Sequence, residues 1–179
     1  MSELKILHAA DLHLDSPFEG LGAAKAAQRR DEQRRLLHRI AQLAEEESVD
    51  IVLLAGDLLD SDSTYAETAE ALASALGSIS APVFISPGNH DFYSPRSPYA
   101  RVKFPENVHI FKNPTPECVA LPKLNANVWG AAFCDKYSAG MLGGFAAGCS
   151  KPFSRLWISS MEDAATVSYT HLRAHETVL

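Results

Sequence analysis

The sequence has few cysteines, no long apolar run and no low-complexity tract, and each shortage excludes a class of protein. Its three cysteines, Cys118, Cys134 and Cys149, show no close paired spacing, which argues against a disulfide framework or a zinc ribbon. No apolar run reaches the roughly 20 residues that a membrane span needs. The first five residues lack the basic and apolar segments of a secretory signal. We therefore expect a cytoplasmic protein that makes no use of a membrane.

The sequence also has fewer basic than acidic residues. The chain has 16 lysines and arginines against 22 aspartates and glutamates, and its formal net charge is -6. This balance argues against binding nucleic acid through overall charge, although bound divalent cations would offset several negative charges locally. The remaining composition, 46% hydrophobic and 21% charged over 179 residues, is typical of one soluble globular domain.

Short apolar runs alternate with helical patterns along the chain. Three runs predict buried parallel strands, at residues 4–10, 51–55 and 83–85. A long helical stretch separates the first two, and a second helix is expected from about Tyr65 to Leu76, with Ser63 or Thr64 as its N-cap. This order predicts βαβ crossovers and an α/β sheet. Three shorter strands are expected further on, at residues 108–111, 119–121 and 128–132.

The long helical stretch has an apolar face and a basic one. Its apolar residues recur at helical spacing and are expected to pack on the sheet: Leu36, Leu37, Ile40, Leu43 and Ala44. Its five arginines could meet a phosphate backbone. Because Asp31 and Glu32 lie among them, a solvated helix face is the favoured interpretation.

Metal-binding residue types directly follow each of the first three predicted strands. The three runs are Asp11-Leu12-His13, Gly56-Asp57 and Gly88-Asn89-His90-Asp91. Because open α/β sheets gather ligands at the carboxyl ends of their strands, the runs can converge in space. Alternation along the chain would point Asp11 and His13 to one side and Leu12 into the core.

Carboxylates, imidazoles and one amide make a mixed oxygen and nitrogen site, which suits manganese, iron or zinc better than calcium or magnesium. We expect two divalent ions about 3.5–4 Å apart, a pair that hydrolyses phosphate esters. Asp57 would bridge them, Asp11 and His13 would hold the first, and Asn89 would hold the second.

His90 is the candidate for stabilising or protonating the leaving oxygen, and Asp91 the candidate for orienting its ring. Three other histidines, His8, His38 and His109, are predicted to be structural. Asp15 and Asp60 are predicted to face solvent. Each motif alone could be a simple turn, but three in this order favour one shared site.

The pattern resembles that of the calcineurin-like metallophosphoesterases: Asp-x-His, Gly-Asp, then Gly-Asn-His-Asp or Gly-Asn-His-Glu. Residues 8–18, 49–60 and 107–111 further resemble the bacterial SbcD-type DNA repair exonucleases. The resemblance implies an α/β/β/α sandwich and manganese-dependent cleavage of DNA phosphodiesters. It also implies a partner ATPase of the SbcC-like coiled-coil class.

The C-terminal part departs from that family. Its members carry a strand that ends in His-Gly and a later Gly-His-x-His, and this sequence has neither. The tail resembles a translated sequencing-library adapter, in which His171 and His175 imitate a helical metal pair. We therefore expect residues 1–166 to form a partial catalytic domain, truncated at its C-terminal side, and residues 167–179 to be a non-native tail.

Two classes of function fit these observations. The first is a metal-dependent nuclease, weakly active or inactive as this chain stands. The second is a non-catalytic fragment or interaction module that holds metal poorly. Within the enzyme class, a phosphatase or a small-molecule phosphodiesterase would use the same core, since specificity lies in the loops. No arginine follows the Gly-Asp motif at residues 58–63 to hold a phosphate dianion, so a diester fits better.

Overall fold

The computed structural model describes residues 4–61 and 65–137, together with the backbone of two strands at residues 154–159 and 166–170. Within these ranges no helix combines the length and the apolar character that crossing a bilayer requires.

A four-stranded parallel sheet forms the centre of the molecule. Its strands follow one another in the order of the chain: β1 (Ile6–Ala9), β2 (Ile51–Ala55), β3 (Val83–Ser86) and β4 (Val108–Ile110). Every residue of β2 and β3 is buried, which explains why both strands are apolar without alternation. The three predicted parallel strands are confirmed, and the strand predicted at 108–111 joins the same sheet as β4.

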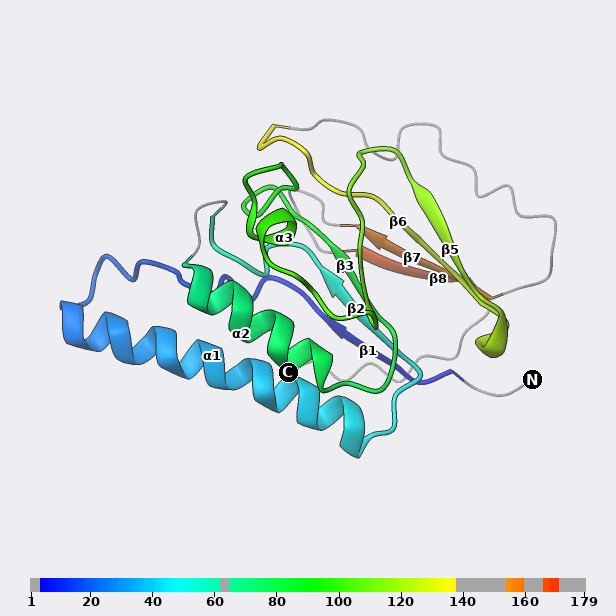
Figure 1. The fold of residues 1–179 in the computed structure, drawn as a ribbon, viewed down its shortest axis with the longest axis horizontal. Coiled ribbons are helices and arrows are strands. Elements are labelled where there is room, and N and C mark those ends of the chain that lie inside the picture. The colour runs from blue at the N-terminus through cyan, green and yellow to red at the C-terminus, as the bar shows by residue number, and fades with distance from the viewer. Residues whose placement is uncertain (1–3, 62–64, 138–153, 160–165, 171–179) are drawn as a thin grey trace.

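Two helices cover one face of this sheet, α1 (Ala23–Glu46) and α2 (Ala66–Gly77), while the short α3 (Pro98–Arg101) follows β3 (Figure 1). Helix α1 buries Leu37, Ile40 and Ala44. The prediction for Leu36 is wrong, because this side chain is 39% exposed. Successive helical residues are rotated by about 100°, so the face centred on Leu37 turns its neighbour outward.

The N-cap of α2 also differs from the prediction. The helix begins after Tyr65, which takes the N-cap position without a side-chain cap of its own. Ser63 and Thr64 lie outside the described residues. The helix begins there because a residue distant in the sequence supplies an acceptor: the Asp15 carboxylate accepts the Tyr65 N–H at 3.2 Å.

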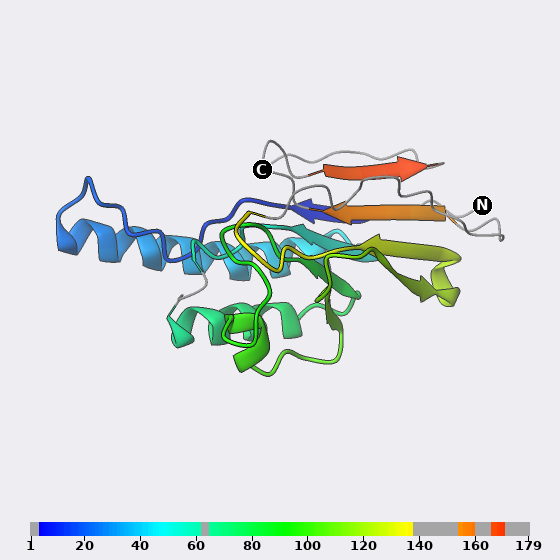
Figure 2. The ribbon, with the colours of Figure 1, turned by 90° about the horizontal axis from the view of Figure 1, so that it is seen from above.

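A second sheet lies against the other face of the first one (Figure 2). Its order is β5 (Glu117–Leu121), β6 (Ala126–Gly130), β7 (Ser154–Ser159) and β8 (Thr166–Thr170), with the 3₁₀ turn η1 (Pro122–Leu124) between β5 and β6. Strands β6 and β7 are parallel, and the two outer pairs are antiparallel. The strands predicted at 119–121 and 128–132 are confirmed: β5 begins two residues earlier than predicted, and β6 lies two residues earlier at both ends.

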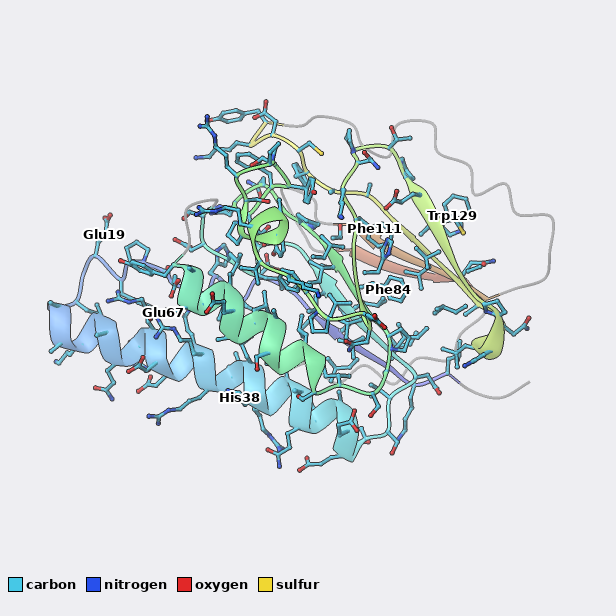
Figure 3. The ribbon with its side chains drawn as sticks, viewed as in Figure 1. Glu19, His38, Glu67, Phe84, Phe111 and Trp129 are labelled. Atoms are coloured by element: carbon cyan, nitrogen blue, oxygen red, sulfur yellow. The ribbon has the colours of Figure 1, made fainter. Side chains whose placement is uncertain are left out.

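The core has two parts. One fills the space between the first sheet and the helices, around Leu54, Leu72 and Ile85. The other joins the two sheets through Phe84, Phe111 and Val128. Figure 3 labels the two phenylalanines. The described residues thus form α, β and β layers, and the second helical layer of the expected sandwich is not among them.

Strand β8 spans the boundary expected at residue 166. The division at that residue and the origin of the tail stay predictions. His171 and His175 lie outside the described residues.

Candidate metal centre

The first two motifs run side by side beyond the ends of β1 and β2. The Asp11 N–H donates to the Gly56 carbonyl at 3.1 Å, and the His13 N–H donates to the Asp57 carbonyl at 2.9 Å. Leu14, fully buried, continues this parallel pairing with Leu59. The pairing continues the register of the sheet, so it fixes where the first motif lies relative to Asp57.

The third motif meets Asp57 through a glycine. A side chain at Gly88 would place its Cβ 2.2 Å from Asp57 Oδ1, a distance at which nothing but glycine fits. The His90 N–H donates to the same Asp57 oxygen at 3.0 Å. Loops from three neighbouring strands therefore meet at one carboxylate, as expected for the carboxyl edge of a parallel sheet.

Two groups of metal-binding side chains result. The ligand atoms of Asp11, His13 and Asp57 all lie within 4.8 Å of one another, which confirms that the first two motifs converge. Two carboxylates and an imidazole fit a divalent transition metal. The second group has the same spread and consists of His13, Asp60 and His90.

Asp60 lies within the candidate site, a position that the sequence interpretation missed. It was expected to face solvent, but its side chain is only 26% exposed and its Oδ1 lies 3.1 Å from His13 Nδ1. Ser16 Oγ donates to the same oxygen at 3.3 Å. The sequence offered one indication of this position: Asp60 stands three residues after Asp57, at the end of the same loop.

The backbone brings Asp11 and His13 together by a different route from the one expected. Strand β1 ends at Ala9, so strand alternation no longer applies beyond it. Asp11 (φ 53°) and His13 (φ 44°) are left-handed, as is Asp57 (φ 50°). Non-glycine residues are uncommon there, and such strain, of the order of 1–3 kcal/mol each, clusters at functional sites.

Asp91 has a different position from the one expected beside the His90 ring. Its carboxylate is fully buried and accepts the Tyr99 hydroxyl and four backbone N–H groups, those of Gly88, Asp57, Leu58 and Leu59. Burial raises the pKa of Asp91, and the hydrogen bonds from Tyr99 and the backbone oppose that rise. Burial, and then the adjacent Asp91 charge, raises the pKa of Tyr99. Asp91 thus ties the loops after β2 and β3 to each other.

His90 and Asn89 lie on the loop that Asp91 holds. His90 is exposed, with its Nδ1 3.3 Å from the Asp60 carbonyl oxygen. Its ring meets the His13 ring edge-on, with centroids 5.0 Å apart. Asn89 is half-buried, and its chain neighbours Gly88 and His90 both lie against Asp57 Oδ1.

Other residues singled out from the sequence lie outside this centre. His38 is exposed on α1 (Figure 3), and His109 packs between Phe84 and Phe111. The arginines of α1 favour the solvated-face interpretation, since three of them pair with carboxylates: Arg29 with Glu32, Arg34 with Asp31 and Arg39 with Glu46. Asp15 was expected in solvent, but its side chain is 4% exposed, because it is hydrogen-bonded to α2.

Comparison with known proteins adds an independent line of evidence. A profile described as calcineurin-like phosphoesterase matches residues 4–171. The uncharacterized metallophosphoesterase YhaO of Bacillus subtilis is 33% identical over 123 residues, which is 65% of this chain and 30% of the relative. The SbcD component of the nuclease SbcCD, from the same organism, is 27% identical over 118 residues, 64% of this chain and 29% of the relative. The chain thus spans about 30% of the length of these two relatives.

Proposed function

The chain belongs to the calcineurin-like phosphoesterase family, and from that premise we propose that it is a metal-dependent phosphodiesterase that cleaves DNA, a DNA repair exonuclease. Its α, β and β layers are three of the four layers of the family fold. The observation that carries the proposal is the convergence of Asp11, His13 and Asp57, with ligand atoms within 4.8 Å of one another.

The residues of the rim have distinct roles in this proposal. Asp11 and His13 would hold one ion, Asn89 would hold a second, and Asp57 would be shared. The mixed oxygen and nitrogen donors suit manganese, iron or zinc, and we propose manganese because the resemblance to the SbcD-type exonucleases implies it. When bound, such a pair of ions supplies an activated water nucleophile and neutralises charge that develops on the phosphoryl oxygens.

His90 is proposed to serve the leaving oxygen. It is exposed at the rim, where a substrate can reach it. In the imidazolium form, its Nδ1–H would donate to the Asp60 carbonyl, 3.3 Å away, which would orient the ring, and its Nε2–H would donate to the leaving oxygen. Asp91 is proposed as a positioning residue, because its carboxylate engages the backbone of both loops and not the reacting groups.

DNA is favoured as the substrate by two observations. One of the relatives is named as part of a nuclease. The Gly-Asp loop from Leu58 to Ser61 has no arginine to bind a phosphate dianion, which favours a diester over a monoester. The same relative is named as one component of a complex, so we propose a coiled-coil ATPase of the SbcC type as the partner.

A hydrolysis assay with two substrates tests the proposal. The chain is loaded with Mn²⁺ and given linear double-stranded DNA and, separately, an aryl phosphate monoester, with Asp57→Asn as the inactive control. Release of nucleotides by the unmutated chain, and not by Asp57→Asn, would support the exonuclease. Cleavage of the monoester alone would indicate a phosphatase.

The second candidate is a non-catalytic fragment or interaction module. Metal affinity separates this candidate from the nuclease, since such a module would hold metal poorly or not at all. Weak Mn²⁺ binding together with failure to cleave either substrate would support this candidate.

A further inference from the structure

We propose that Asp15 is a positioning residue for the metal centre: it ties the loop that carries His13 to α1 and α2, and so sets the affinity for the ion that His13 holds. The inference rests on the proposed metal site. It concerns a carboxylate that lies outside both groups of metal-binding side chains.

The Asp15 side chain is buried and fully engaged. One carboxylate oxygen accepts the Thr68 hydroxyl at 2.8 Å, and the other accepts the Tyr65 N–H at 3.2 Å. The Arg34 guanidinium lies 3.5 Å away. A buried carboxylate is tolerated only where such partners compensate for lost hydration. Asp15 therefore has one well-defined position, and His13, two positions earlier in the chain, shares that constraint.

Helix α2 depends on this contact at its first turn. The first N–H groups of a helix have no partner within it, and here no side chain of the N-cap residue supplies one. Asp15 supplies an acceptor from a separate loop, and its negative charge is favourable at the positive end of the helix dipole. Thr68, in the first turn, is fully buried beneath it.

Helix α1 also contacts the loop that carries His13 and Asp15. Arg34 Nε donates to Thr68 Oγ1 at 3.1 Å, which leaves the hydroxyl proton for Asp15. The preceding residue, Gln33, donates from Nε2 to the His13 carbonyl at 2.9 Å. Adjacent residues of α1 therefore fix His13 and Asp15 together. Helices α1 and α2 lie side by side along this face (Figure 1).

The loop needs these ties because its backbone is strained. His13 (φ 44°) and Asp15 (φ 64°) are both left-handed, a conformation that persists only where the surroundings enforce it. Without the Asp15 bonds, the segment can relax toward ordinary backbone angles. The His13 imidazole would then shift relative to the Asp57 carboxylate, although the bond from the His13 N–H to the Asp57 carbonyl limits how far its main chain can move.

The test compares Asp15→Asn with Glu45→Gln as a matched control. Glu45 also accepts one backbone N–H and one hydroxyl, both from Ser80, but at the other end of α1. Co²⁺ is titrated into each protein and followed by its visible absorption, which reports affinity and coordination without any substrate. We expect Asp15→Asn to bind Co²⁺ about tenfold more weakly and Glu45→Gln to bind it as the unmutated chain does.

A second pair of variants keeps the test decisive if Asp15→Asn does not fold. Thr68→Val removes the hydroxyl that joins Asp15 to Arg34, whereas Thr68→Ser keeps it. We expect Thr68→Val to weaken Co²⁺ binding and Thr68→Ser to restore it. In the metal-free protein, hydrogen exchange over residues 11–16 should be faster in Thr68→Val than in Thr68→Ser.

The outcomes separate this inference from the proposed function. Unchanged Co²⁺ affinity in both Asp15→Asn and Thr68→Val would overturn the positioning role, as would an unmutated chain that binds no Co²⁺. A chain that binds Co²⁺ tightly, responds to Asp15→Asn and yet leaves DNA intact would refute only the nuclease.

Discussion

Replacing Gly88 by alanine should damage the metal centre directly. The added Cβ would lie 2.2 Å from Asp57 Oδ1 and 2.7 Å from the Asp57 backbone nitrogen. Ordinary contact is about 3.5 Å, so the carboxylate must retreat by roughly 1 Å or more. Overpacking of this kind costs about 1–3 kcal/mol. The His90 N–H would also lose its charged acceptor, worth about 1.5–3 kcal/mol.

We therefore expect Gly88→Ala to lower the free energy of unfolding by about 3 kcal/mol. Phosphodiester hydrolysis should fall about 100-fold, because a 1 Å displacement at a reacting centre has that effect. Urea unfolding measures the first quantity, and initial rates at saturating Mn²⁺ measure the second. Mn²⁺ affinity should fall as well, since Asp57 is the shared ligand in the proposal.

Gly130→Ala is the matched control. Its Cβ would lie 2.1 Å from the Phe111 ring, an equally severe clash between the two sheets that does not involve Asp57. It should destabilise the fold to a similar degree and leave the Mn²⁺ affinity of the folded protein unchanged. The reasoning is refuted if Gly88→Ala keeps its metal affinity, or if both variants lose it equally.

Three further outcomes can be measured. His90→Ala should reduce DNA cleavage about 10²–10⁴-fold with metal content unchanged, and equal turnover would contradict a role in leaving-group stabilisation. Tyr99→Phe should lower the free energy of unfolding by about 1.5–3 kcal/mol, because its hydroxyl donates to the buried Asp91 carboxylate; a change within error in urea titrations would argue against that bond. Burial raises the pKa of Asp91 above its usual 3.8, so the folded protein binds the Asp91 proton more tightly than the unfolded chain does. Protonation of Asp91 therefore stabilises the fold fully below pH 3.8, and this contribution is lost as the pH rises through the folded pKa. The difference in free energy of unfolding between the unmutated chain and Asp91→Asn should therefore narrow with rising pH. A difference that widens instead would show that the pKa of Asp91 is not raised in the folded protein.

The sequence predicts the strands well because each is a short, buried apolar run. The limits of β2 agree with the prediction, and those of β3 agree within one residue. The convergence of Asp11, His13 and Asp57 also follows from the chain, since parallel strands present their carboxyl ends at one edge. Leu36 was misplaced because helical spacing alone does not decide which of two adjacent leucines faces the sheet.

The supporting contacts of the site could not be predicted in this way. Asp60 meets His13 across 47 positions of sequence, and Asp15 meets Tyr65 across 50. Hydrophobic periodicity encodes which side of an element is buried, and it carries no information on such distant polar pairs. Asp91 was assigned to the wrong neighbour for the same reason, because its partners are backbone N–H groups, which every residue except proline carries.

The left-handed backbone at Asp11 and Asp57 also affects how inactive variants should be made. Aspartate and asparagine tolerate this conformation, whereas alanine resists it. An alanine substitution at either position would therefore change the local chain path as well as remove a charge, and loss of activity could not be assigned to the missing ligand. Asparagine preserves shape and backbone preference together, so it is the substitution that isolates the electrostatic contribution of each carboxylate.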